Sequence, residues 1–223
     1  LSETKKEHEE CIARYGRTPA RVFYDEGVFR AKTLAAHCVH VTDEDIDILA
    51  DNGVSAVHNP VSNLKLGSGV APVCAMLARG VNVALGTDGC CSNNSHDLFE
   101  EIKLAALLAK GTSLDPTKLP AYEAIKLATV NGARAQGRDG QTGQVKKGLQ
   151  ADLILIGTHK PSMQPYYSEA SAVAYAARGS DVRLTMIKGK ILYENGEFTT
   201  IDIERALHDV QSVAVPVVKG EKQ

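Results

Sequence analysis

Short apolar runs alternate with amphipathic segments through the first half of the chain. The pattern predicts strands at the start of 32–40 and at 54–57 and 81–85, and helices at 3–15, 42–53, 70–79 and 97–110. Strands that alternate regularly with helices are typical of βα units, whose strands form a parallel sheet. We therefore predict an α/β fold for this part of the chain.

The helix beginning after Thr42 carries the clearest local signal. Asp45 follows three positions later, as in a capping box, in which each residue's side chain accepts from the other's backbone N–H. Ile46 and Leu49 then recur at helical spacing, and Gly53 ends the helix.

The pattern changes after a further predicted helix at 120–132. Strands are predicted at 142–145, 151–156 and 184–193, the last with a hairpin turn at Lys188-Gly189, and a final helix at 203–213. A complete (β/α)8 barrel needs about 250 residues, so the βα units before residue 111 form only part of one. We predict barrel sequence at 1–140, a small β-sandwich-like domain at 141–200, and a C-terminal helix and tail at 201–223.

Side chains that could bind a metal ion or transfer a proton follow the three predicted parallel strands. His37, His58 and Asp88 each come directly after a strand, and Glu3 lies near the start of the chain. Taken singly, each has an ordinary structural explanation, because such histidines are often only hydrogen-bonded and Gly-Thr-Asp-Gly is often only a turn. Parallel α/β barrels place their active sites at these strand ends, so together they indicate a site.

Composition and charge narrow the class of protein. Apolar residues make up 43% of the chain and the formal net charge is −2, which argues against a disordered chain and against a nucleic-acid partner. The sequence has neither a membrane-length apolar run nor a signal peptide, so we expect a cytoplasmic protein. The five cysteines include no C-x-x-C pair, which argues against a disulfide framework and a structural zinc site.

Several motifs together resemble those of the amidohydrolase superfamily. The similarity is greatest to its branch of 5-methylthioadenosine/S-adenosylhomocysteine deaminases and related chlorohydrolases. The matching stretches are 1–4, 35–40, 58–67, 86–89 with 92–94, and 143–156. The resemblance implies that this chain is the C-terminal part of a metal-dependent TIM-type barrel with a small β domain.

The resemblance also implies a role for each candidate residue. Asp88 matches the aspartate that binds the metal and takes a proton from the metal-bound water. His37 matches the histidine that hydrogen-bonds the attacking oxygen, and Glu3 the glutamate that protonates a ring nitrogen, so both also contact the substrate. His58 and Asn63 correspond to positions that shape the site.

The implied reaction is hydrolytic deamination of an aminopurine nucleoside, in which a metal-bound hydroxide attacks the ring carbon that bears the amine. The cofactor would be one divalent metal ion, zinc, with iron or nickel as alternatives. Other enzymes of this kind act on guanine or on chlorinated triazines. A third alternative is a metal-free relative that binds without catalysis.

The metal ligands that the resemblance implies are incomplete in this sequence. No His-x-His occurs among the seven histidines, and a further ligand is expected immediately before Leu1. A catalytic zinc typically needs three protein ligands. We therefore expect the partners to be a small-molecule substrate, a missing N-terminal half of the same protein and further copies in a homo-oligomer, with no membrane involved. The segment alone is expected to be inactive.

Overall fold

The computed structural model describes residues 1–220, and the chain forms two compact units. The first unit contains residues 1–149 and 158–181, and the second contains 150–157 and the chain from Val182 onward. The predicted domain boundaries at 140 and 200 stay a prediction. Residues 221–223 of the predicted tail lie outside the described residues.

A parallel sheet organises the first unit. Its strands lie in the order β1-β2-β3, and they are β1 (Leu34–Ala36), β2 (Ser55–His58) and β3 (Asn82–Leu85). Because the strands are parallel, their carboxyl ends meet at one edge. The α/β class and all three predicted strands are confirmed.

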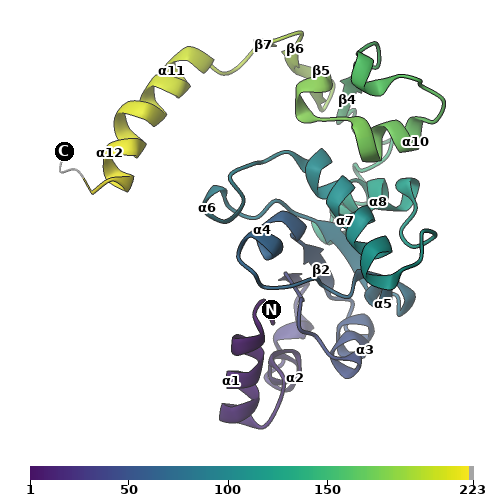
Figure 1. The fold of residues 1–223 in the computed structure, drawn as a ribbon, viewed down its shortest axis with the longest axis vertical. Helices are drawn as coiled ribbons and strands as arrows, with labels where there is room; N and C mark the ends of the chain where they lie inside the picture. Colours follow the sequence, from purple (N-terminus) through teal and green to yellow (C-terminus); the bar gives the residue numbers. More distant parts are fainter. Residues whose placement is uncertain (221–223) are drawn as a thin grey trace. The chain divides into compact units, whose positions relative to one another are not determined.

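Helices connect and cover these strands (Figure 1). The α-helices of the first unit are α1 (Lys5–Tyr15), α2 (Pro19–Asp25), α3 (Asp43–Asp51), α4 (Pro60–Lys65), α5 (Val73–Ala78), α6 (Cys90–Asn93), α7 (Leu98–Ser113), α8 (Ala121–Ala128), α9 (Val130–Ala135) and α10 (Glu169–Ser171), and several of them pack on the strands. Helices α5, α7, α8 and α9 contact β3. The core beneath them includes the fully buried Leu49, Met76 and Val83, so apolar burial holds helices and sheet together.

The predicted capping box at the start of α3 is confirmed. The Thr42 hydroxyl accepts from the Asp45 backbone N–H at 3.2 Å, and the Asp45 carboxylate accepts from the Thr42 N–H at 3.0 Å. Asp45 is buried and also accepts a hydrogen bond from the Thr18 hydroxyl, which ties α3 to the start of α2.

We expect Thr42→Ala to lower the free energy of unfolding by about 1 kcal/mol, because it leaves the Asp45 N–H without its acceptor. Denaturant unfolding of the full-length protein measures the loss, and Thr42→Ser, which keeps the hydroxyl, should restore most of it. Equal stability of the alanine and serine variants would contradict the role of the cap.

The second unit contains an antiparallel sheet. Its strands follow the order β4-β5-β6-β7, and they are β4 (Leu153–Ile156), β5 (Val182–Ile187), β6 (Lys190–Glu194) and β7 (Glu197–Phe198). The predicted turn at Lys188-Gly189 joins β5 to β6, and both residues have positive φ, 51° and 78°, as a type I′ hairpin requires. The final helical segment begins with α11 (Ile203–Asp209) and ends with α12 (Val215–Val218).

The strand predicted at 142–145 is wrong, because residues 142–144 form bends beside α9 and Val145 has no regular structure. Gly143 has a φ of 94°, and a Cβ atom at this position would lie 2.7 Å from the Ala133 Cβ. The backbone therefore passes too close to α9 for a regular strand with side chains at this point.

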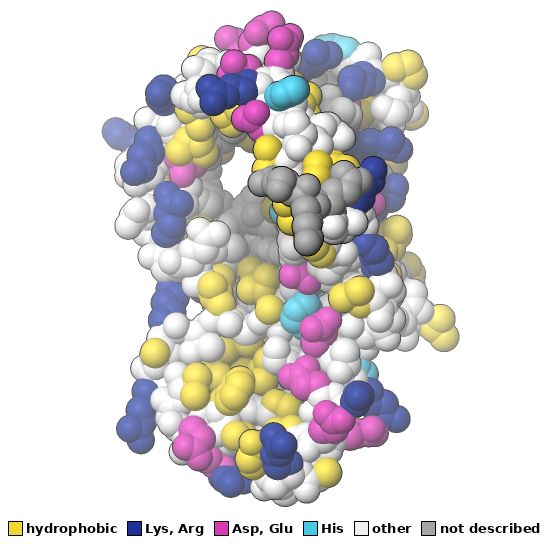
Figure 2. Space-filling view, turned by 90° about the vertical axis from the view of Figure 1, so that its left-hand side faces the viewer, with side chains coloured by type: hydrophobic (Ala, Val, Ile, Leu, Met, Phe, Trp, Pro, Cys, Tyr) yellow, Lys and Arg dark blue, Asp and Glu magenta, His cyan; other side chains and the backbone are white. Residues whose placement is uncertain are grey.

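Charges of both signs are mixed on the molecular surface. On the face shown in Figure 2, Lys and Arg side chains are interspersed with Asp and Glu, in keeping with the formal net charge of −2. No helix within residues 1–220 combines the length and the apolar character needed to cross a bilayer.

Candidate active site

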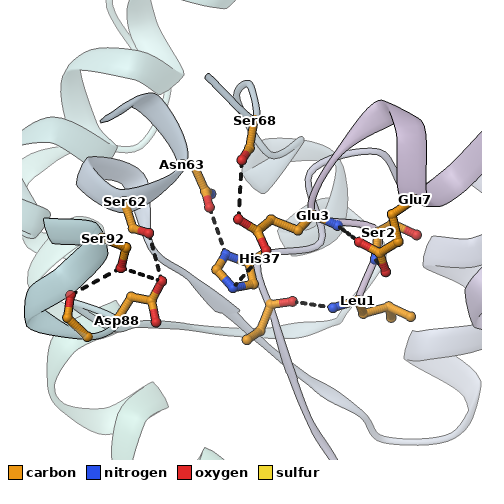
Figure 3. A network of polar contacts seen from close by, with 12 residues as sticks. Leu1, Ser2, Glu3, Glu7, His37, Ser62, Asn63, Ser68, Asp88 and Ser92 are labelled. Carbon is orange, nitrogen blue, oxygen red and sulfur yellow. Dashed lines mark hydrogen bonds and ion pairs between the residues drawn. The ribbon is translucent and has the colours of Figure 1, made fainter. Parts of the chain in front are cut away.

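The carboxyl ends of the three parallel strands bring the candidate residues to one edge of the sheet (Figure 3). His37 directly follows β1, and Asp88 lies in the loop after β3. Both have left-handed backbone conformations, with φ of 71° and 60°. Such conformations are uncommon for residues other than glycine and are concentrated at functional sites.

Glu3 reaches this edge because the first residues of the chain run beside β1. The Leu1 nitrogen donates to the Ala36 carbonyl at 2.9 Å. The Glu7 carboxylate, in the first turn of α1, accepts from the backbone N–H groups of Ser2 at 3.1 Å and Glu3 at 2.8 Å. The backbone that carries Glu3 is therefore fixed at both ends.

Glu3, His37 and Asn63 form a row at the site. One Glu3 carboxylate oxygen accepts from the Ser68 hydroxyl at 3.3 Å, and the other lies 3.7 Å from His37 Nε2. On its opposite side, His37 Nδ1 lies 2.8 Å from Asn63 Oδ1. Because 3.7 Å is too long for a hydrogen bond, Asn63 rather than Glu3 fixes the ring, and Nε2 stays available to a substrate.

Asp88 lies at the same edge, where two serine hydroxyls donate to its carboxylate. One of its oxygens accepts from the Ser62 hydroxyl at 2.7 Å and from the Ser92 hydroxyl at 2.9 Å. The Ser62 hydrogen bond is the main cause that lowers the pKa of Asp88, against a smaller opposing effect of burial. Gly86 lies two residues before Asp88. A Cβ atom at this position would lie 2.5 Å from Asn59 Oδ1, so the backbone here leaves no room for a side chain.

His58 lies at the end of β2 with only 1% of its surface exposed. Burial, followed by the nearby His37, lowers its pKa to about 4. The Nδ1 atom has no hydrogen-bond partner. His58 is therefore neutral at physiological pH and brings no charge to this edge of the sheet.

We expect His58 to make the stability pH-dependent. Its pKa is about 4 when folded against an ordinary 6.5, so between these values only the unfolded chain binds the proton. The free energy of unfolding should fall by up to about 3 kcal/mol as the pH falls through this window. Denaturant unfolding at several pH values measures the slope.

Two variants distinguish the contribution of His58 to this pH dependence from the contributions of other titrating groups. His58→Gln should flatten the slope, whereas His159→Gln, at an exposed histidine, should leave it unchanged. An unaltered slope in His58→Gln would contradict the assignment.

The described residues do not hold a complete metal centre. Within residues 1–220, no three His, Cys, Asp or Glu side chains lie together in an arrangement that could hold a metal ion. Asp88 is a suitable zinc ligand in type and charge. Asp88 could therefore supply one of the ligands that a zinc site needs.

Sequence reasoning missed the residues that hold the candidates in place. These are Ser62 and Ser92 on Asp88, Ser68 on Glu3, and Glu7 beneath the Glu3 backbone. Serine is common and carries no pattern of its own. Ser62 and Ser92 stand in the matching stretches 58–67 and 92–94, but these stretches do not indicate which carboxylate each hydroxyl contacts.

The chain belongs to the amidohydrolase family, whose sequence model matches residues 1–192. It is 48% identical over 99% of its length to a 5-methylthioadenosine/S-adenosylhomocysteine deaminase of Caldanaerobacter subterraneus, covering 51% of that protein. It is 46% identical over 97% of its length to a 5'-deoxyadenosine deaminase of Methanosarcina mazei, covering 50% of it. The chain thus spans about half the length of the curated relatives it matches.

Solved structures show the same fold. An adenosine deaminase from Xanthomonas campestris with bound zinc matches with a TM-score of 0.94 at 35% identity, over 98% of this chain and 50% of that one. An atrazine chlorohydrolase from Arthrobacter aurescens complexed with zinc matches with a TM-score of 0.85 at 27% identity, over 93% of this chain and 46% of that one.

Proposed function

We propose that this chain is part of a metal-dependent hydrolase that deaminates an aminopurine nucleoside of the 5-methylthioadenosine or S-adenosylhomocysteine type. The observation that carries the proposal is that Glu3, His37 and Asp88 meet at one edge of the sheet. The names of the relatives support the reaction and substrate class, since their similarity extends over nearly the whole chain.

Asp88 would hold the metal ion, which we propose to be zinc because the similar solved structures contain it. A bound divalent metal supplies a strong nucleophile at neutral pH, because it lowers the pKa of coordinated water toward about 7. The hydrogen bonds from Ser62 and Ser92 fix one oxygen of Asp88 and lower the pKa of its carboxyl group. Its other carboxylate oxygen would take a proton during the attack.

Glu3 and His37 would act on the substrate. The ring must accept electrons as the nucleophile adds, so an acid has to protonate a ring nitrogen, and Glu3 is the carboxyl group at the site suited to this step. The departing nitrogen also needs a proton, because an amide ion is a poor leaving group. His37 would hydrogen-bond the attacking oxygen through Nε2.

We further propose that the parallel sheet is the C-terminal part of a (β/α)8 barrel and that the antiparallel sheet belongs to a small β-sandwich-like domain. Leu34, on the edge strand β1, is 51% exposed, which is unusual for an apolar strand residue inside a closed barrel. Residues outside this chain would cover it and supply the remaining metal ligands, in keeping with relatives of about twice the length.

A substrate panel tests the proposed reaction. The full-length protein, loaded with zinc, is incubated with 5-methylthioadenosine, S-adenosylhomocysteine, 5'-deoxyadenosine, guanine and a chlorinated triazine. We expect ammonia release from the adenosine-type nucleosides. Ammonia from guanine alone, or chloride from the triazine, would favour a different ring. No zinc binding and no release from any compound would favour a non-catalytic relative.

A further inference from the structure

One turn of α4 contacts both sides of the candidate site. Ser62 and Asn63 are consecutive and fully buried, with 0% exposure each. The Ser62 hydroxyl donates to Asp88 at 2.7 Å, and the Asn63 amide oxygen lies 2.8 Å from His37 Nδ1. Groups that follow two different strands are thus held by neighbouring residues of a third segment (Figure 3).

The Asn63 contact determines which nitrogen of His37 carries the proton. A carbonyl oxygen only accepts, so Nδ1 must be the donor. In the neutral imidazole Nε2 is then left with a lone pair. That lone pair lies on the side of Glu3, whose carboxylate is 3.7 Å away.

The stability of the fold alone does not account for an amide side chain at Asn63. The Nδ2 atom of Asn63 is buried without a hydrogen-bond partner. Leaving a buried polar group unpaired costs about 1 to 3 kcal/mol. An apolar residue at this position would avoid that cost but would leave His37 Nδ1 without its partner.

We propose that Asn63 is a positioning residue, which keeps the proton of His37 on Nδ1 and so presents Nε2 as a hydrogen-bond acceptor. Nε2 can then receive a hydrogen bond from the hydroxyl group that adds to the substrate ring. The hydrogen bond from this hydroxyl group to Nε2 rests on the proposed function. The protonation of His37 on Nδ1 does not.

The proton is located by long-range ¹H–¹⁵N correlation spectra of the full-length protein, labelled with ¹⁵N-histidine and recorded where His37 is neutral. A His37→Gln variant assigns the signal. We expect the wild-type ring to be protonated on Nδ1. In Asn63→Ala the population should move to Nε2–H, and Asn63→Asp, whose carboxylate also accepts, should retain Nδ1–H.

Ser62→Ala is the matched control for disturbance of α4. It removes a buried hydrogen bond from the same helical turn, but the bond goes to Asp88 rather than to His37. We therefore expect this variant to keep the wild-type His37 tautomer. A wild-type ring protonated on Nε2, or the same tautomer in Asn63→Ala as in the wild type, would overturn the proposal.

Steady-state kinetics separate this proposal from the proposed function. Asn63→Ala should lower kcat about 10- to 100-fold, by analogy with partners that orient a metal-binding histidine, with partial recovery in Asn63→Asp. If the wild type turns over no substrate but the tautomers behave as expected, the reaction is misassigned and Asn63 still positions His37. If the wild type is active and Asn63→Ala keeps its kcat, the positioning role is refuted.

Discussion

Asp88→Asn is expected to abolish deamination by the full-length protein and to weaken its binding of zinc. Asparagine has nearly the same shape, and its amide oxygen still accepts from Ser62 and Ser92, so the loop should keep its conformation. The variant lacks the negative charge that we propose binds the metal and the oxygen that we propose takes a proton. We expect kcat/KM to fall by at least about 10⁴-fold, the upper end for a group that transfers protons.

Two measurements are needed, namely kcat/KM with the preferred nucleoside and the zinc content after dialysis against a competing chelator. Asp51→Asn, at an exposed residue that ends α3, is the matched control and should leave both unchanged. Wild-type zinc content together with wild-type turnover in Asp88→Asn would show that the metal is held elsewhere.

Glu3→Gln is expected to spare the metal while lowering the rate about 10²- to 10⁴-fold, the range for general acid–base groups. The glutamine carbonyl can still accept from Ser68, and Glu7 still holds the backbone. The fold at this position should therefore survive. An amide has no acidic proton to transfer to the ring nitrogen, so the loss should appear mainly in kcat.

Glu10→Gln serves as the control, since Glu10 lies exposed on α1 with its carboxylate 3.7 Å from the Lys6 amine. It should keep full activity. Undiminished turnover in Glu3→Gln would remove Glu3 from the proton-transfer role, and a loss of zinc in the same variant would assign it to the metal instead.

Local signals account for the elements that were predicted correctly from the sequence. The three parallel strands are short apolar runs between helices, and the Thr42–Asp45 cap of α3 involves neighbours in the chain. The strand predicted at 142–145 does not form because of a tertiary contact, the packing of Gly143 against α9. Sequence spacing carries no information about that contact.

The residues of the candidate site likewise include some that the sequence predicts and others that it does not. Each of Glu3, His37 and Asp88 is a recognisable chemical type in a motif, so all three were predicted as site residues. Two of the serines that hold the two carboxylates are distant in the sequence, since Ser68 is 65 positions from Glu3 and Ser62 is 26 positions from Asp88. Ser92 is only four positions from Asp88, but serine is too common a residue to indicate the contact. The partners of the two distant serines are determined by the packing of the helices, which a single sequence does not reveal.

The left-handed backbone at His37 and Asp88 bears on how relatives of this protein would diverge. Each non-glycine residue in this conformation costs about 1 kcal/mol, which a working enzyme tolerates because it needs those side chains. A descendant that no longer catalysed the reaction would be free to place glycine there at little energetic cost. Glycine at both positions would therefore mark a lineage that has kept the fold and abandoned its chemistry.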